Sequence, residues 1–272
     1  MVLGAQKLQL VDRLHICNDL SSLEIVKREM DLLARSSTIA RSEWARRAGV
    51  PRSTLYRALE GSVDVRLGTL HELAYAAGFE IDMSFRPTSD PEASDAARVL
   101  LGDAEAMHLT SQGIASWTER IERFAGDGGV EDILAEAGRA SSLMFREGAI
   151  GMRGTFSADR LASCGYATGR DWALSGADSL EAMGVPVSTE GIHVLWTSQP
   201  KHAMQLLLDA GSVATHEHEV DLFICNPSAL TLHGVVDLEG IRLVSPVQGM
   251  IDCMGLREYE RDLARSVVEG WK

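Results

Sequence analysis

The sequence has few cysteines and no long apolar run, and these absences exclude several classes of protein. Its four cysteines among 272 residues are scattered, without a Cys-x-x-Cys pair, which favours reduced, mostly buried thiols over a disulfide framework or a structural zinc site. No segment reaches the roughly 18 uncharged apolar residues that a membrane span needs. The apolar N-terminus is interrupted by Asp12, Arg13 and Asp19. We therefore expect a cytoplasmic protein with neither a signal peptide nor a membrane partner.

Several motifs that carry catalysis or bind cofactors are also missing. The sequence has no Gly-x-Ser-x-Gly nucleophile elbow, and the glycine-containing stretch 151–157 lacks the lysine of a phosphate-binding loop. His216-Glu217-His218 places no third metal ligand, so we interpret this stretch as a solvent-facing loop. We therefore predict no catalytic residue, no metal ion and no cofactor.

The charge of the chain is unevenly distributed. Overall, 26 Lys and Arg residues stand against 39 Asp and Glu residues, giving a formal net charge of -13. Residues 1–88 carry 12 basic and 11 acidic side chains, whereas the remaining residues carry 14 and 28. Within 41–57 alone there are five arginines and one glutamate. This pattern indicates a local anion-binding patch on an otherwise acidic protein, with an ordinary solvated helix face as the alternative.

Composition and periodicity divide the chain into three parts. The stretch RPTSDPEASD at 86–95, with two prolines, serines and acids, is typical of a linker. We predict a multidomain α+β protein with an all-α helix-turn-helix domain over 1–85, a linker and helical connector over 86–150, and an α/β domain over 151–272.

Individual elements follow from the hydrophobic period and from capping residues. In the N-terminal part we expect helices over 21–35, 41–48, 51–59 and 67–77, then a strand or extended arm over 79–85. Ser21 and Glu24 form a capping box at the start of the first helix. In the connector we expect helices near 94–102, 110–125 and 130–147. In the C-terminal part we expect strands at 172–176, 192–196, 219–225 and 241–245, with helices around Leu180 and over 200–211, 246–254 and 257–270.

The stretch AGVPRSTLYRALEG at 48–61 joins two of these helices through a three-residue corner. Gly49 can adopt the positive φ that ends the first helix, and Pro51 suits the first turn of the next. A helix, a short corner and a second helix form the geometry that presents the second helix to the major groove of DNA.

This segment resembles a known family of DNA-binding domains. The sequence TIARSEWARRAGVPRSTLYRALEG, followed by GTLHELAYAAGFEIDMSF, resembles the Xre family of lambda-repressor-like domains. Ala45 takes the small position of the second helix, Gly49 the corner, and Leu55 the buried position of the recognition helix. The resemblance covers roughly residues 20–85 and implies sequence-specific binding to double-stranded operator DNA.

The side chains that are not needed for packing define the predicted DNA contact. Arginine can donate two hydrogen bonds to guanine, and Ser, Thr or a further Arg can hold phosphates. The predicted DNA-binding residues are Arg41, Ser42, Arg52, Ser53, Thr54, Tyr56 and Arg57.

Some positions in this region keep two interpretations. Arg41 stands where the Xre family usually carries Gln, and it suits a phosphate contact. Arg46 and Arg47 either contact the DNA backbone or are simply solvated. Tyr56 alternatively packs on the fourth helix.

The C-terminal part carries a second resemblance. WALSGADSLEAMGVPVSTEGIHVLW, and later LVSPVQGMIDCMGLREYERDLARSVVEGW, resemble the minimal nucleotidyltransferase fold, in which a strand, a small-residue turn and a helix lead to a strand with two metal-binding aspartates. By this resemblance the carboxylate positions fall at Gly191 and His193, and a third falls at Asp221, which is alternatively a polar residue at a strand edge. Glycine offers no ligand and histidine suits magnesium poorly, so we predict a non-catalytic frame.

Together, the two resemblances are similar to the antitoxin/repressor proteins of type IV (AbiE-like) toxin–antitoxin systems. This similarity implies a transcriptional repressor that autoregulates its own operon as a homodimer and has a partner toxin protein. Two alternatives remain open. One is an active metal-dependent nucleotidyltransferase with a DNA-binding module, and the other is a toxin-neutralising protein that does not bind DNA.

Overall fold

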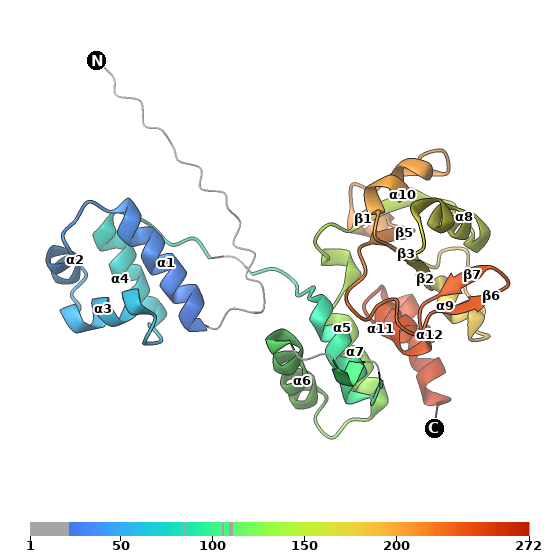
Figure 1. Ribbon diagram of the computed structural model, residues 1–272, viewed down its shortest axis with the longest axis horizontal. Helices are drawn as coiled ribbons and strands as arrows, with labels where there is room; N and C mark the ends of the chain where they lie inside the picture. Colours follow the sequence, from blue (N-terminus) through green and yellow to red (C-terminus); the bar gives the residue numbers. More distant parts are fainter. Residues whose placement is uncertain (1–21, 84, 105, 109–110, 272) are drawn as a thin grey trace, which may run out of the picture. The chain divides into compact units, whose positions relative to one another are not determined.

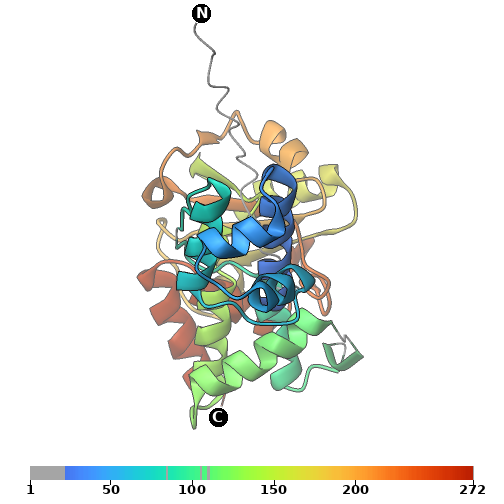
Figure 2. The ribbon, with the colours of Figure 1, turned by 90° about the vertical axis from the view of Figure 1, so that its left-hand side faces the viewer.

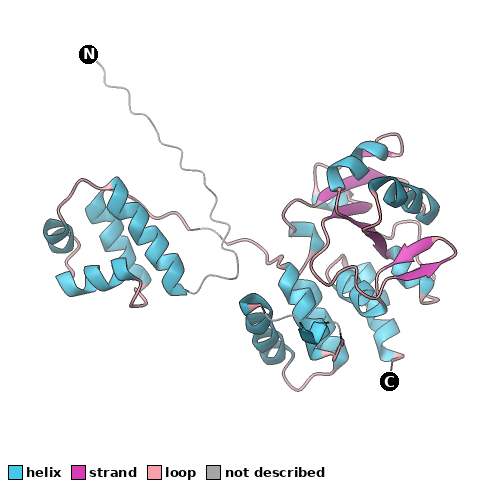
Figure 3. Cartoon of the chain, in the orientation of Figure 1, coloured by secondary structure: helices cyan, strands magenta, loops and turns pink. Residues whose placement is uncertain are grey.

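The computed structural model describes residues 22–83, 85–104, 106–108 and 111–271. The chain is a mixed α/β protein, as the sequence predicts, and it divides into two compact units, Met1–Phe85 (unit 1) and Arg86–Lys272 (unit 2). In Figure 3 the strands belong to unit 2, whereas the described part of unit 1 is helical. None of the described helices combines the length and the apolar character needed to cross a membrane.

The described part of unit 1 contains α1 (Ser22–Ser36), α2 (Arg41–Arg47), α3 (Arg52–Glu60) and α4 (Leu67–Ala77) (Figure 1). These bounds closely confirm the predicted helices of this region. Pro51 immediately precedes α3 rather than occupying its first turn. Ser21 of the predicted capping box lies outside the described residues.

The core of unit 1 forms where its helices meet. Met30, Trp44, Leu55 and Leu73, one from each helix, are almost completely buried, and the Trp44 indole N–H donates to the Leu73 carbonyl at 2.7 Å. Gly49 adopts a φ of +64°, a left-handed conformation that costs glycine little and that turns the chain from α2 into α3. The inner side of α3 is thus fixed by packing, and its outer side remains exposed.

The alternating segment after α4 forms no strand in its described residues. α4 ends at Gly78, whose φ is +89°, and the described part of unit 1 offers no strand with which the segment can pair. Its apolar side chains remain exposed, since Phe79 is 39% and Phe85 is 96% accessible. Of the two expectations for 79–85, the strand is therefore wrong.

Unit 2 is built on a seven-stranded mixed sheet with the order β4-β1-β5-β3-β2-β7-β6. β2 runs antiparallel to β3 and parallel to β7, β5 is parallel to β3, and β1 is antiparallel to both β4 and β5. β6 and β7 form a hairpin at one edge. The strands are β1 (Ile150–Gly154), β2 (Trp172–Gly176), β3 (His193–Thr197), β4 (Gly211–Val213), β5 (Leu222–Cys225), β6 (Val236–Leu238) and β7 (Ile241–Leu243).

Helices cover both faces of the central strands, whose side chains alternate between two cores. In β2, Trp172 and Leu174 face a core that includes α8 (Ala158–Thr168) and α10 (Pro200–Leu206). Ala173, between them, belongs to the opposite core, which includes the 3₁₀ helix η2 (Leu143–Phe145). Because both faces are covered, β2, β3 and β5 are buried almost throughout.

A layer of further helices lies beyond the sheet. α5 (Pro91–Leu100), α6 (Gln112–Ala125), α7 (Val130–Ala140), α11 (Pro246–Met254) and α12 (Glu258–Glu269) share one apolar core. Figures 1 and 2 both show them together at the lower end of unit 2. The residues that the sequence assigned to a separate linker and connector, 86–150, therefore lie within unit 2, because α5 and α7 pack on α11.

Sequence reasoning missed β1, β4, β6 and α8 and extended two helices too far. β1 and β4 are short and contain glycines, so they lack the apolar run that marks a strand. The predicted helix 200–211 ends at Leu206, because Gly211 already pairs with Gly154 in the sheet. The predicted helix 130–147 ends at Ala140. Three short elements complete the described part of unit 2: α9 (Ala177–Ala182), η1 (Ala106–His108) and η3 (Glu217–Glu219).

A buried carboxylate joins the sheet to the helical layer. Asp252 of α11 accepts hydrogen bonds from the Ser175 hydroxyl at 2.6 Å, the Trp196 indole at 2.9 Å and the Gln248 amide at 2.8 Å. Gln248 in turn accepts from the Ser94 hydroxyl of α5 at 3.1 Å. Burial raises the pKa of Asp252, and the three hydrogen bonds oppose that shift. Asp252 therefore connects β2, β3 and α11, and Gln248 extends the connection to α5.

Three of the four cysteines lie in the described residues, and all three are buried free thiols, as predicted. Burial raises the pKa of Cys164 on α8 to about 11 and that of Cys225 on β5 to about 12, and it also raises the pKa of Cys253 on α11. Raised thiol pKa values keep these side chains protonated and unreactive in the folded state. Cys17 lies outside the described residues.

The closest helix contact in the layer depends on two glycines. A Cβ atom added to Gly138 of α7 would lie 2.6 Å from the Ile251 carbonyl oxygen and 2.7 Å from the Gly255 nitrogen. A Cβ atom added to Gly255 would lie 2.6 Å from the Gly138 carbonyl oxygen. Backbone meets backbone at this point, so neither helix can accommodate a side chain without moving.

We expect Gly138→Ala to lower the free energy of unfolding of unit 2 by about 1–3 kcal/mol, the usual range for overpacking a tight contact. Gly129→Ala is the matched control at the start of the same helix, because Gly129 has a negative φ and open space around its Cβ position. Urea titrations monitored by circular dichroism measure both changes. Equal effects of the two substitutions would contradict the tight contact.

Candidate functional site

The outer side of α3 carries most of the predicted DNA-binding residues. Arg52, Ser53, Tyr56 and Arg57 are exposed and are spaced so that they share one side of the helix. Leu55 and Ala58, on the opposite side, are completely buried. Thr54 lies at the flank of this side and is only partly exposed.

α2 adds the remaining predicted residues to the same surface. The Arg41 guanidinium lies over the Tyr56 ring, 5.6 Å from the ring centroid, a distance at which a cation is attracted to an aromatic face. Tyr56 is 43% exposed, and its ring is engaged by Arg41 of α2. Ser42 and Arg52 both line a hollow of about 330 Å³ between α2 and α3. The structure thus brings Arg41 to Tyr56 and Ser42 to Arg52.

The five arginines of 41–57 fall into two groups. Arg46 and Arg47 both donate to the Glu43 carboxylate, with Nε–oxygen distances of 2.8 and 2.9 Å. These hydrogen bonds lower the pKa of Glu43 to about 2, so Glu43 keeps its negative charge beside them. The other three, Arg41, Arg52 and Arg57, have no carboxylate partner among the ion pairs of the described residues.

Three positions of unit 2 match the metal-binding carboxylates of the nucleotidyltransferase fold, namely Gly191, His193 and Asp221, and each has a different structural environment. Gly191 is buried, and a Cβ atom there would collide with the Val187 side chain. The carboxylate of Asp221 accepts from the Gly154 amide at 2.8 Å, and its carbonyl accepts from the His193 amide at 2.9 Å. Asp221 therefore joins β1 to β3 next to β5, which agrees with its interpretation as a polar residue at a strand edge.

His193, at the start of β3, forms a pair with a buried carboxylate. Its Nδ1 atom lies 2.9 Å from Oδ2 of Asp178 on α9, and the side chain of Asp178 is only 2% exposed. Burial lowers the pKa of His193, but the hydrogen bond and the charge of Asp178, together with Glu181 and Asp221, outweigh burial and raise it overall. The sequence signal for this pair was absent, since Asp178 and His193 lie on different elements.

An acidic hollow opens beside this pair. Its volume is about 570 Å³, and we name it from its five carboxylate side chains, Asp159, Asp178, Glu181, Asp237 and Glu239. Leu238 of β6 forms part of its rim, and neither Lys nor Arg lines it. Within the part of the chain that the structure describes, no group of three His, Cys, Asp or Glu side chains is arranged to hold a metal ion.

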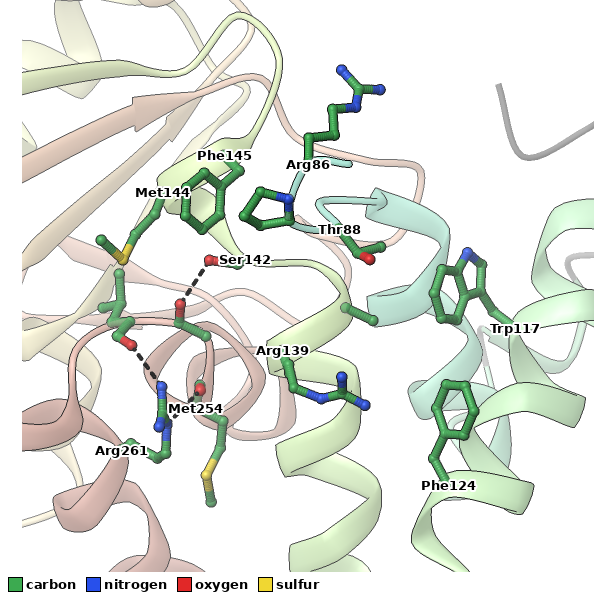
Figure 4. A pocket seen from close by; sticks show the side chains of 14 residues that line it. Arg86, Thr88, Trp117, Phe124, Arg139, Ser142, Met144, Phe145, Met254 and Arg261 are labelled. Carbon is green, nitrogen blue, oxygen red and sulfur yellow. Dashed lines mark hydrogen bonds between the residues drawn. The ribbon is translucent and has the colours of Figure 1, made fainter. Parts of the chain in front are cut away.

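A second cavity in unit 2 has the opposite charge. The arginine cavity, of about 400 Å³, is lined by Arg86, Arg139 and Arg261 together with Trp117 and Phe124 (Figure 4). These five side chains come from four separate segments of the chain, which no local pattern connects. Sequence reasoning therefore missed the cavity entirely.

Comparison of the chain with protein families, curated proteins and solved structures gave no match. The structure itself offers three candidate functional surfaces. They are the arginine-bearing helix α3 in unit 1, and the acidic hollow and the arginine cavity in unit 2.

The His193–Asp178 pair makes stability depend on pH. Because the folded-state pKa of His193 is raised above its ordinary value of 6.5, its contribution to stability is fully present below that value and is lost as pH rises through the folded-state pKa. We expect His193→Gln to lower the free energy of unfolding more at about pH 6 than at about pH 9. Denaturant titrations at the two pH values measure the difference.

An NMR titration of the histidine ring protons supplies the direct check. In the parent protein His193 should titrate above the ordinary value, and Asp178→Asn should lower its pKa. His202→Gln, at an exposed position on α10, is the control for the removal of an imidazole side chain. A His193 that titrates at or below the ordinary value contradicts the assignment.

Proposed function

We propose that the chain is a sequence-specific DNA-binding regulator that represses its own operon as a cytoplasmic homodimer. The observation that supports this proposal most strongly is the outer surface of α3. There a short helix after a tight corner carries Arg52, Ser53, Tyr56 and Arg57 on one exposed side, while its other side is buried.

The proposed contact uses each side chain for a distinct purpose. Arg52 stands in the first turn of α3, the part of a recognition helix that usually meets base edges, and its guanidinium can donate two hydrogen bonds to guanine. Ser42 and Arg57 supply contacts to phosphates, which position the helix without reading sequence. Arg41, stacked on Tyr56 at 5.6 Å, is held near the same groove with fewer conformations to lose on binding.

Charge placement favours a local contact with DNA over general adhesion. The three arginines of this surface that lack a carboxylate partner provide attraction to phosphate, whereas the excess of 28 acidic over 14 basic residues beyond residue 88 repels it. DNA binding by such a chain should weaken as the salt concentration rises, in proportion to the number of phosphates that its cations contact, because each contact releases counterions from the DNA. A dimer that reads two half-sites supplies the specificity that one small module lacks.

In unit 2 we propose a nucleotidyltransferase-like frame that does not catalyse transfer. Three features support this: the lack of room for a side chain at Gly191, the engagement of His193 by Asp178, and the structural hydrogen bond of Asp221. A magnesium-dependent transfer of nucleotide to protein or RNA by the purified chain would contradict it.

A second candidate function is the neutralisation of a partner toxin, and the edge of the sheet favours it. β6 is the last strand of the sheet, and its Val236 and Leu238 are 43% and 45% exposed. This unpaired edge adjoins the acidic hollow. An extended partner segment can add to a free strand edge, and basic side chains on that segment would complement the carboxylates. We therefore infer a partner protein with a basic, extended segment.

The regulator proposal predicts that Arg52→Ala and Arg47→Ala weaken operator binding to different extents, although each substitution removes one positive charge. Arg52→Ala should weaken binding to the cognate operator by about 1–3 kcal/mol and relax the base preference. Arg47→Ala should cost less, because Arg47 is already paired with Glu43. Fluorescence anisotropy with operator fragments selected from the source genome measures both variants at one salt concentration. Equal losses for the two variants, or tight operator binding by Arg52→Ala, would overturn the assignment of α3.

The partner proposal predicts a separable defect in unit 2. Glu181→Lys combined with Leu238→Lys should abolish protection of cells against a growth-arresting protein encoded next to this gene. Glu119→Lys, at an exposed position on α6, is the charge control and should still protect. Arg52→Ala should also protect when both proteins are expressed from foreign promoters. Protection by the double variant would exclude the sheet edge as the docking site.

A further inference from the structure

The arginine cavity places positive charge inside the acidic half of the chain. Three arginines line it, and its lining includes neither Asp nor Glu. The residues from 89 onward carry twice as many acidic as basic side chains, so a cationic concavity there is not explained by the general composition. We therefore expect the arginine cavity to favour an anionic ligand.

Arg261 is the best fixed of these cations. Its Nε donates to the Met254 carbonyl and one Nη to the Leu256 carbonyl, both at 3.2 Å. Two neutral carbonyl groups hold the guanidinium in place without cancelling its charge. No ion pair of the described residues involves Arg261. A side chain oriented in this way has its charge and its remaining N–H groups available for a carboxylate or phosphate.

Arg139 approaches the cavity from α7. Its guanidinium forms an ion pair with Glu136, to which Nε donates at 3.1 Å, and it lies 5.7 Å from the centroid of the Phe124 ring. Figure 4 shows the guanidinium directed toward Phe124, whereas that of Arg86 points away from the other lining side chains. Arg261 is thus the arginine best placed to meet a ligand, and Arg139 adds a guanidinium whose charge Glu136 partly offsets.

Aromatic and sulfur-containing side chains form the walls of the cavity. Phe124 and Phe145 line the cavity and are 45% and 40% exposed. Trp117 is oriented by its indole N–H, which donates to Asp90 at 2.8 Å. Met144 and Met254 complete the lining with polarizable surface. The walls suit a flat apolar body more than a hydrated inorganic ion.

We propose that the arginine cavity binds a small organic anion with a flat apolar body, such as an aromatic carboxylate. Its volume of about 400 Å³ lies in the usual range for small-molecule sites, roughly 300–1,000 Å³. The anionic group meets Arg261 and Arg139, and the ring lies against Phe124 and Trp117. The cavity includes no residue of α3. The ligand proposal can therefore be correct or wrong independently of the regulator proposal.

The test compares probes that share one ring system and differ in the head group. The full chain is titrated with 1-naphthoate, 1-naphthyl phosphate and the neutral analogue 1-naphthalenemethanol, and binding is followed by the NMR signal of the Trp117 indole, assigned with Trp117→Phe. At least one anion should bind about tenfold or more tightly than the neutral analogue, as expected for charge-assisted hydrogen bonds. Carboxylate and phosphate heads are distinguished by which of the two probes binds more tightly.

Variants locate the binding. Arg261→Gln should weaken binding of the anion about tenfold or more. Arg139→Gln should weaken it by a smaller factor, because Glu136 partly offsets the charge of Arg139, and it should fold normally because Arg139 is largely exposed. Arg265→Gln, on the same helix as Arg261 but outside the cavity, should change binding less than about twofold. The proposal is overturned if neither anion binds, if the neutral analogue binds as well, or if neither Arg261→Gln nor Arg139→Gln weakens binding. Equal binding of a flexible Asp- and Glu-rich peptide without aromatic residues would also overturn it, because it would indicate a protein-docking surface.

Discussion

The side chain of Asp252 constrains how unit 2 is assembled, because a buried carboxyl group without hydrogen bonds is costly to the folded state. Its donors come from β2, β3 and α11, and Gln248 extends the network to α5. Any rearrangement of α11 against the sheet would leave at least one of these groups unsatisfied. The helical layer is therefore held at one position and one angle, and the Gly138–Gly255 contact of α7 with α11 depends on that placement.

A consequence of this rigid frame is the separation of opposite charges onto different surfaces. The acidic hollow lies at the edge of the sheet, next to β6, whereas the arginine cavity lies among α6, α7, α12 and the segment that enters α5. The exposed cations of α3 belong to the other unit. Each surface therefore favours a different class of partner, and the net negative charge of unit 2 disfavours the approach of nucleic acid to it.

Sequence reasoning succeeded where a local signal determines the structure. α11 was predicted with correct bounds, since Ser245 caps it and Pro246 occupies its first turn, and the helices of unit 1 were recovered because glycines and apolar positions agree in register. It failed for α8 and β1, which carry weak periodicity. The clustering of Arg139, Arg261 and Trp117 could not be foreseen, because it depends on how distant helices pack. The pairing of Arg46 and Arg47 with Glu43 was not predicted, although residues three and four apart on a helix are neighbours.

The buried thiols can be used to measure local opening motions of unit 2. Cys164 lies on the buried side of α8, Cys225 in the central strand β5 and Cys253 in α11, the helix that carries Asp252. A thiolate-specific reagent can reach each sulfur only when the surrounding layer opens. Labelling rates at the three positions thus report separately on fluctuations of the outer helices, the sheet and the inner helical layer.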